Sequence, residues 1–280
     1  LRFAEKSVNH LGDLLGTACT INEPNIVSFV GYQMGMFPPG ATDDAQFEAA
    51  NANFIDAHRR VVPVLKGGPG DFPVGLTLSM ADYQAVPPGD VDAITRRDHV
   101  RAVSEDQFLD IVGKDDFLGV QVYSRTRVGA KSVLGGEEGV PTLPMGYEFW
   151  PESLGACLRR AWDYTGGSVP LLVTENGIGT NDDPQRIDYV QGALEGVLSG
   201  TTIATLAWTE RGQRYSLKAK GMKAESAGDG YVLSGEKTMV MGALIADLFI
   251  VTADIGGETA CFLVPKDAPG LEVRAYRLAD

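Results

Sequence analysis

Residues 20–24 read Thr-Ile-Asn-Glu-Pro and form a polar end to the apolar run that precedes them. Pro24 has no amide proton to donate to a sheet, so a strand that reaches this point must end here. A second apolar run, about 150 residues later, ends in the same way with Val-Thr-Glu-Asn-Gly at 173–177. Each run therefore ends in a glutamate beside an amide, at Glu23 and at Glu175.

Strand-like and helix-like segments alternate around these two glutamates. Strands are expected over 18–21, 73–80, 116–123 and 169–174, separated by segments with helical periodicity and, at 83–97, by a loop rich in Pro, Gly and Asp. Such alternation predicts an α/β fold, with a parallel sheet and the helices outside it. In a (β/α) barrel the functional residues lie at the carboxyl ends of strands, and Glu23, Tyr123 and Glu175 all fall there.

The sequence changes character after residue 200. No helical period is visible there, and the Asp-Gly pair at 229–230 between two strand-like runs predicts a hairpin. Further strands are expected over 240–252, 260–264 and 271–276. We therefore expect two domains, 1–198 and 199–280, the second being a small antiparallel all-β domain.

Composition limits the classes of partner. The chain has 280 residues and a formal net charge of −13, which argues against a nucleic-acid or anionic-membrane partner because both need a basic surface. Its three cysteines are too few and too scattered for a disulfide framework, and its three histidines have no ligand-like spacing, so no metal is expected. The oligomeric state does not follow from the sequence.

The chain carries no targeting or membrane signal that we can identify. No run of 18 apolar residues is present, and no signal-peptide pattern is visible. These observations predict a cytoplasmic protein. The first residue is Leu1 and not a methionine, which favours a cut N-terminus and leaves a lost targeting sequence as the alternative.

The glutamate pair suits one chemistry in particular. A retaining glycosidase needs one carboxyl group that protonates the leaving oxygen and one carboxylate, about 5 Å away, that attacks the anomeric carbon. Glu23 fits the acid/base, with the Asn22 amide beside it to hold a sugar hydroxyl. Glu175 fits the nucleophile, and Tyr123 fits a hydrogen-bond donor to it. On spacing alone, a solvated or helix-capping glutamate is the more common alternative.

The two pentapeptides resemble the signature motifs of glycoside hydrolase family 1, the β-glucosidases, at every position. The segments 37–40, 117–119 and 182–189 are also similar to that family. The resemblance implies that Glu23 is the acid/base, Glu175 the nucleophile, Asn22 a ligand of the sugar 2-hydroxyl and Tyr123 the hydrogen-bond partner of the nucleophile. Gln121 stands where the family usually has Asn.

The resemblance covers residues 1–198 and implies strands four to seven of an eight-stranded (β/α)8 TIM barrel. The sugar-gripping Gln, His and Trp of the family's first three strands have no counterpart here, and neither do the Trp and Glu of its last strand. The implied substrate is a small-molecule β-glycoside, and the implied chemistry needs no cofactor. Four strands cannot close a barrel, so we expect very low or no glycosidase activity from this chain alone.

The segment 199–280 resembles the middle β-domain of acyl-CoA dehydrogenases. The resemblance rests on Leu-Ala-Trp-Thr-Glu at 206–210, on the run from 228 to 237 and on Phe-Leu-Val-Pro at 262–265. It implies FAD as a cofactor, with Thr209 bonded to the flavin. Met239 and Val240 stand where the family usually has a Trp-Ile-Thr type stretch against the flavin, which is a departure from the family.

Three hypotheses follow for the whole chain. The first is a retaining β-glycosidase that works by a two-glutamate double displacement. The second is an FAD-dependent acyl-CoA dehydrogenase fragment, although the catalytic glutamate of that family has no counterpart here. The third is a non-catalytic chimera, a join of two unrelated gene pieces. We label the function as glycosidase because both of its catalytic carboxylates are present.

Overall fold

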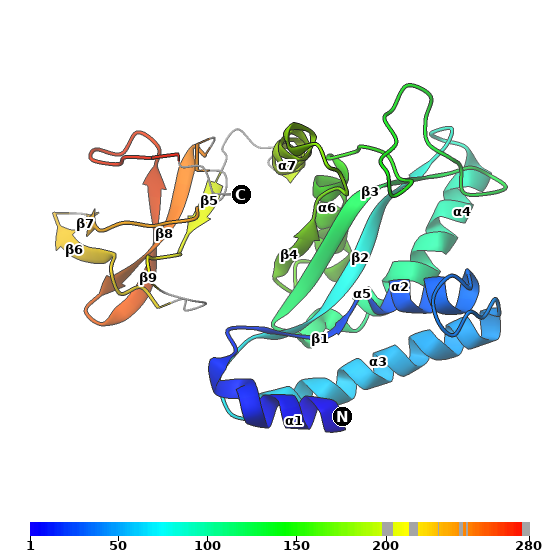
Figure 1. The fold of residues 1–280 in the computed structure, drawn as a ribbon, viewed down its shortest axis with the longest axis horizontal. Coiled ribbons are helices and arrows are strands. Elements are labelled where there is room, and N and C mark those ends of the chain that lie inside the picture. Colours follow the sequence, from blue (N-terminus) through cyan, green and yellow to red (C-terminus); the bar gives the residue numbers. More distant parts are fainter. Residues whose placement is uncertain (198–203, 213–217, 229, 241–242, 245, 276–280) are drawn as a thin grey trace. The chain divides into compact units, whose positions relative to one another are not determined.

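The computed structural model describes residues 1–197, 204–212, 218–228, 230–240, 243–244 and 246–275. The chain divides into two compact units, Leu1–Ser199 (unit 1) and Gly200–Asp280 (unit 2) (Figure 1). The assignment of one domain to 1–198 and another to 199–280 stays a prediction, because residues 198–203 lie outside the described residues.

Unit 1 contains a four-stranded parallel sheet with the order β1-β2-β3-β4. The strands are β1 (Ala18–Asn22), β2 (Val74–Ala85), β3 (Phe117–Val128) and β4 (Leu171–Asn176). Consecutive order and a single direction are the geometry of half a (β/α) barrel, in which each strand is followed by a helix. The expected α/β class with a parallel sheet is confirmed.

Helices precede and follow each of these strands. The α-helices are α1 (Arg2–Leu11), α2 (Pro24–Ser28), α3 (Asp44–Lys66), α4 (Val91–Arg101), α5 (Gln107–Leu109), α6 (Ser153–Thr165) and α7 (Asp183–Val197). Shorter turns of other helix types are η1 (Gly12–Leu14), η2 (Phe29–Gln33), η3 (Ala102–Asp106) and η4 (Val112–Lys114). Helix α3 packs on β1 and β2, and α6 packs on β2 and β3 (Figure 1).

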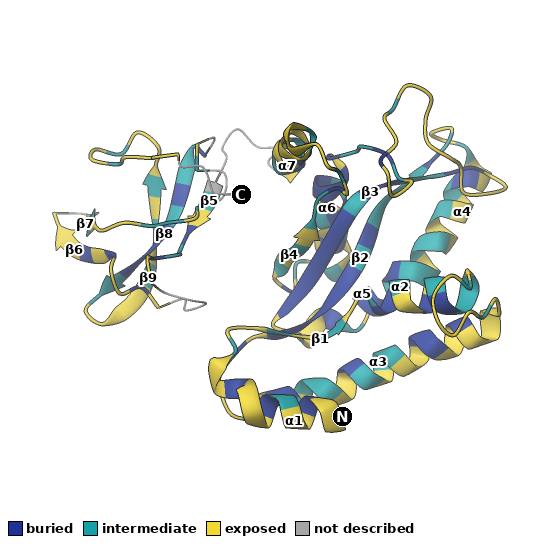
Figure 2. Ribbon diagram, in the orientation of Figure 1, coloured by how far each residue is buried: buried dark blue, intermediate teal, exposed yellow. Residues whose placement is uncertain are grey.

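The core of unit 1 lies between the two central strands and the helices that cover them. Its largest cluster is built from alternate residues of β2 and β3 together with Phe108, Leu109 and Cys157. Figure 2 shows β2 and β3 mostly buried, whereas β4 is mostly intermediate or exposed. The sheet is therefore well covered at its centre and open at its margins.

One expectation for unit 1 is wrong. The segment 83–97 was expected to be a loop, but β2 continues to Ala85 and α4 begins at Val91. The strand is extended because residues 82–85 pair in parallel with residues 125–128 of β3. The Asp90 side chain accepts a hydrogen bond from the Ala93 amide at 2.8 Å and caps α4, so the connection between the two elements is short.

Unit 2 is a five-stranded sheet. Its strands are β5 (Ala204–Ala207), β6 (Lys223–Ala227), β7 (Gly230–Ser234), β8 (Leu248–Ile255) and β9 (Glu258–Pro265). The order is β5-β8-β6-β7, with β9 also paired to β8. The hairpin expected around 229–230 is present as the antiparallel β6–β7 pair.

The expectation of a purely antiparallel second sheet is wrong. Strands β5 and β6 both pair with β8 in parallel, so the sheet is mixed. Hairpin neighbours must be antiparallel, but the long connection from β5 to β8 permits the parallel arrangement. The strands expected at 240–252 and 271–276 are also wrong in part, since the described residues of 240–247 and 271–275 form no strand.

Among the described residues, none of the helices combines the length and apolar character needed to cross a lipid bilayer.

Candidate active site

Glu23 lies where the end of β1 turns into α2. Its backbone is left-handed (φ 45°, ψ 54°), which costs a non-glycine residue about 1–2 kcal/mol. The Glu23 amide donates to the Thr77 carbonyl at 3.1 Å, and the Glu23 carbonyl accepts from the amides of Ile26 and Val27. The residue therefore has the N-cap position of α2, yet its side chain makes no capping hydrogen bond. The carboxyl group is not used to cap its own helix.

The Glu23 carboxyl group is partly withdrawn from solvent. Its Oε1 atom is buried and has no hydrogen-bond partner among the described residues. Burial raises the pKa of Glu23, a hydrogen bond with the Ser79 side chain opposes that rise, and the nearby charge of Glu175 adds to it. A carboxyl group with a raised pKa is suited to donate a proton near neutral pH.

Glu175 is held by donors from the neighbouring strand. The Gln121 Nε2 atom donates to Glu175 Oε1 at 2.6 Å, and the Tyr123 hydroxyl donates to Oε2. The same Gln121 nitrogen lies 2.9 Å from Asn22 Oδ1, so the middle of β3 is linked to the carboxyl ends of β1 and β4. Burial and the bond to Glu175 raise the pKa of Tyr123 well above its ordinary value, which keeps it a donor.

A second layer of hydrogen bonds fixes these side chains. The Thr77 hydroxyl lies 3.1 Å from both the Ile21 carbonyl oxygen and Asn22 Oδ1. The Tyr189 hydroxyl, from α7, donates to the Tyr123 carbonyl at 2.6 Å, and Asn176 Nδ2 donates to the Val122 carbonyl at 2.7 Å. The site is thus supported by sheet and helix residues.

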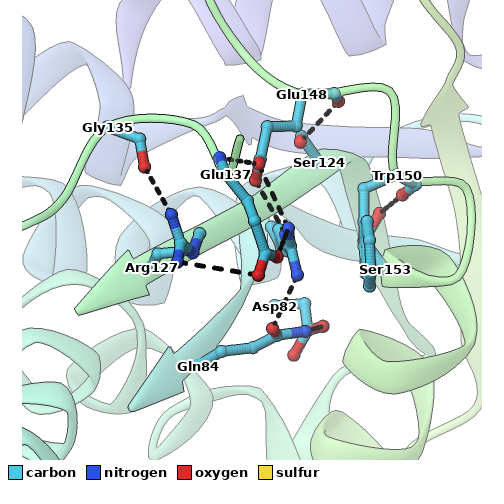
Figure 3. A network of polar contacts seen from close by, with 10 residues as sticks. Asp82, Gln84, Ser124, Arg127, Gly135, Glu137, Glu148, Trp150 and Ser153 are labelled. Carbon is cyan, nitrogen blue, oxygen red and sulfur yellow. Dashed lines mark hydrogen bonds and ion pairs between the residues drawn. The ribbon is translucent and has the colours of Figure 1, made fainter. Parts of the chain in front are cut away.

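The loop after β3 is anchored by an ion-pair network in which Arg125 and Glu148 are buried and Glu137 is exposed (Figure 3). Arg125 donates through Nε to Glu148 at 2.7 Å and through Nη2 to Glu137 at 2.6 Å, and its guanidinium lies 3.5 Å from the centre of the Trp150 ring. The same loop places Tyr147 against Tyr123, with ring centroids 6.4 Å apart. The network therefore orders the segment that borders the glutamate pair.

Five predicted site residues of unit 1 come together: Asn22, Glu23 and Glu175 at the carboxyl ends of β1 and β4, and Gln121 and Tyr123 in the middle of β3. The expectation that Tyr123 ends its strand is wrong, because pairing with β2 extends β3 to Val128. The catalytic and binding roles of these five residues stay predictions. The supporting residues Thr77 and Ser79 were not foreseen, although polar residues alternating with Leu76, Leu78 and Met80 were a usable signal. Tyr147 lies in an aperiodic loop that gave no signal.

The three predicted flavin contacts of unit 2 have different surroundings, and their role stays a prediction. Val240 packs against the apolar core of the unit, while Met239 is exposed and has a left-handed backbone (φ 56°). The Thr209 carbonyl accepts a hydrogen bond from the Thr238 amide at 2.8 Å. The hollow beside Thr209 is lined by other residues: Glu210, Arg211, Gly212, Lys220, Gly221 and Glu236. Its charged side chains are two carboxylates and two cations, so the charge of the lining neither favours nor disfavours a flavin nucleotide's anionic pyrophosphate.

Glu210 instead forms a buried structural cluster. Its carboxylate accepts from the amides of Lys220, Gly221 and Met222 at 3.0, 2.6 and 3.0 Å, and from Lys237 Nζ at 2.8 Å. Burial by itself would raise the pKa of Glu210, but the bonds from Lys237 and the backbone amides outweigh it and lower the pKa to about 2.

Comparison with known proteins identifies a different family in each part of the chain. The family model for glycosyl hydrolase family 1 matches residues 1–132, and the model for the acyl-CoA dehydrogenase middle domain matches residues 205–279. Both resemblances drawn from the sequence are confirmed. The first part of the chain is related to family 1 glycosyl hydrolases, and the last part is related to the middle domain of acyl-CoA dehydrogenases.

Individual relatives agree with this division. A β-galactosidase of Saccharolobus solfataricus is 30% identical over an alignment of 222 residues that covers 68% of this chain and 45% of the relative. A benzylmalonyl-CoA dehydrogenase of Aromatoleum aromaticum is 35% identical over 88 residues, 31% of this chain and 23% of the relative. The crystal structure of β-glycosidase BGL167 is 35% identical, covers 71% of this chain and 52% of its own, and superimposes with a TM-score of 0.60. The chain spans about half the length of the glycosidase relatives it matches.

Proposed function

We propose that unit 1 carries the acid/base chemistry of a retaining β-glycosidase acting on small-molecule β-glycosides. The observation that supports this most strongly is the link from Asn22 through Gln121 to Glu175, beside a partly buried Glu23 with an unpartnered oxygen. A fixed carboxylate and a neighbouring carboxyl group that can donate a proton are the two groups that double displacement needs.

In this proposal Glu175 attacks the anomeric carbon while Glu23 gives its proton to the leaving oxygen. The two donors to Glu175 hold it in one orientation, and Asn22 is oriented by Thr77 to meet the sugar 2-hydroxyl. In the second step Glu23 takes a proton from a water molecule. The water oxygen attacks the anomeric carbon and releases Glu175 from the sugar. The similarity to a β-galactosidase and to β-glycosidase BGL167 supports this reaction class.

We further propose that β1 to β4 correspond to strands four to seven of an eight-stranded barrel. Sugar contacts from the other strands are then missing, and the binding energy that supports the transition state is reduced. With an activated aryl β-glucoside, the chain should therefore turn over far more slowly than the longer β-glycosidase BGL167, and the Glu175→Gln variant should lose what turnover remains. Turnover comparable to that of BGL167 would contradict this part of the proposal.

Covalent trapping tests the site chemistry without relying on turnover. An aryl 2-deoxy-2-fluoro-β-glucoside with a good leaving group should add slowly to Glu175, and peptide mapping by mass spectrometry should locate the adduct. The Glu175→Gln variant should gain none. An adduct on another residue, or none after prolonged exposure, would overturn the nucleophile assignment.

A flavin-dependent function of unit 2 has less support. The family match and the similarity to a benzylmalonyl-CoA dehydrogenase favour descent from that family. The packing of Val240 against the apolar core and the exposure of Met239 argue against a bound flavin. We therefore propose that unit 2 is a non-catalytic β-domain, with the chain as a chimera of two families, and we expect purified protein to show no flavin absorbance.

A further inference from the structure

The two outer edges of the sheet in unit 1 have no pairing partner among the described residues. Strand β1 pairs only with β2, and β4 pairs only with β3, so the outer side of each strand is unpaired. Backbone groups on a sheet edge are a template for another strand, and free edges are usually short, charged, bulged or interrupted by proline.

These edges carry only part of that protection. Strand β1 is short and irregular, but it contains no charged residue or proline, and the six residues of β4 include a single charge, at Glu175. The β4 residues Leu172 and Val173 are 43% and 40% exposed, although both are large and apolar. An apolar edge with few charges is a place where another strand adds to a sheet.

We propose that a second copy of this chain pairs with these edges. The four strands are parallel and follow one another in order, so the β4 edge of one copy and the β1 edge of another fit together without reversing any strand. The partner's β4 then meets the first copy's β1 in the same way. Two such contacts close the assembly, as a twofold axis along the sheet's barrel axis requires.

The number of strands favours this closure. Each copy supplies four strands, and two copies supply the eight for which side chains fill a barrel's interior. A pairing of β4 with β4, or of β1 with β1, would leave two edges open and permit further growth. The net charge of −13 opposes self-association over a distance, and salt screens that repulsion, so the dimer should strengthen as salt is added.

Sedimentation velocity over a wide range of chain concentration is the direct test. The unmodified chain should form one associated species of twice 29.9 kDa, favoured by salt. The variants Val173→Lys and Cys19→Lys each place a charge on one edge strand, and either should convert the dimer to monomer. Both are needed because each contact joins a β4 edge to a β1 edge.

Two matched controls carry the same new charge elsewhere. Phe3→Lys alters an 84% exposed residue of α1, and Leu263→Lys alters a 69% exposed residue of β9 in unit 2; both variants should remain dimeric. A monomer at every concentration, or a ladder of higher masses, would overturn the proposal. The proposal would also be overturned if Leu263→Lys dissociated the dimer. The same holds if only one of Val173→Lys and Cys19→Lys dissociated it. Circular dichroism identifies any variant that fails to fold. If an edge variant does not fold, the sedimentation mass of the unmodified chain still distinguishes a dimer from a monomer or a ladder.

Discussion

Two glutamates, one in each unit, have different hydrogen-bond environments and opposite pKa shifts. Glu210 of unit 2 is bonded to three backbone amides and to Lys237, and these bonds lower its pKa to about 2. Glu23 of unit 1 keeps a buried oxygen without a partner, and burial raises its pKa. A carboxylate whose hydrogen-bonding capacity is filled holds a structure together. One whose capacity is unfilled, and whose charge is disfavoured, is available for proton transfer.

The largest expected effect is the loss of Glu210. Glu210→Ala leaves Lys237 buried without its counter-charge, so we expect a loss of about 3–5 kcal/mol in the stability of unit 2. Hydrogen exchange with mass spectrometry, read on peptides of β6 and β8, measures this without interference from unit 1. The control is Glu236→Ala, whose side chain is 69% exposed and should change stability by less than about 0.5 kcal/mol.

The same cluster predicts an acid-sensitive unit 2. Because the folded-state pKa of Glu210 is about 2 and below its unfolded value, its contribution is fully present at neutral pH and is lost as the pH falls from about 4.5 towards 2. Exchange in β6 and β8 should therefore accelerate over that window, after correction for intrinsic rates, and Glu210→Ala should remove much of the dependence. An unchanged dependence in the variant would show that other groups control acid unfolding.

The next effect concerns the donors to Glu175. Gln121→Ala removes a hydrogen bond to a charged oxygen, worth about 1.5–3 kcal/mol, so labelling of Glu175 by the fluorinated glucoside should slow about 10- to 100-fold. Gln191→Ala alters an exposed glutamine on α7 and should leave the labelling rate unchanged. Equal rates in the two variants would mean that Gln121 does not orient the carboxylate.

A smaller effect is expected at Thr77. Thr77→Val keeps the side-chain shape but removes the donor to the Ile21 carbonyl and Asn22 Oδ1, and we expect a loss of about 1–2 kcal/mol in the stability of unit 1. Exchange on peptides of β1 measures it. Thr77→Ser retains the hydroxyl and should keep those bonds; a Ser variant as weak as the Val variant would assign the loss to packing.

The smallest effect is expected at Glu23 itself. A carboxyl group whose pKa is raised by folding favours the folded state at low pH, and that contribution is lost as the pH rises through the raised value. Glutamine cannot ionise, so Glu23→Gln removes the loss of stability that ionisation of Glu23 causes. At neutral pH the stability of unit 1 should therefore be unchanged or slightly higher. A large destabilisation, comparable to that of Glu210→Ala, would show that the Glu23 carboxylate has a structural role.

Much of unit 1 could be predicted because its signals are local. Apolar runs that end in Asn-Glu-Pro and Thr-Glu-Asn located two strand ends, and the alternation of elements indicated the parallel sheet. The extension of β2 to Ala85 could not be predicted, because it depends on pairing with β3 and not on the composition of the segment. The ion pairs of Arg125 were equally hidden, since Glu137 and Glu148 lie in an aperiodic loop.

Unit 2 was harder to predict for a physical reason. Its hairpin is a local feature marked by a turn pair, but the parallel contact between β5 and β8 joins segments about 40 residues apart. The role of Glu210 also depends on amides and a lysine 10–27 residues away. The family resemblance indicated Thr209 as a site residue. In the structure it is the side chain of the next residue, Glu210, that bonds to backbone amides and to Lys237.

The contrast between the two glutamates can be measured directly. Carbon-detected NMR titration of a chain labelled at its glutamate carboxyl groups, with Glu23→Gln and Glu210→Gln to assign the two signals, gives both pKa values in one sample. We predict that Glu210 titrates near 2 and that Glu23 titrates above the ordinary glutamate value of about 4.5. Ordinary values for both residues, or a Glu23 that titrates below Glu210, would contradict the division into a structural carboxylate and one available for proton transfer.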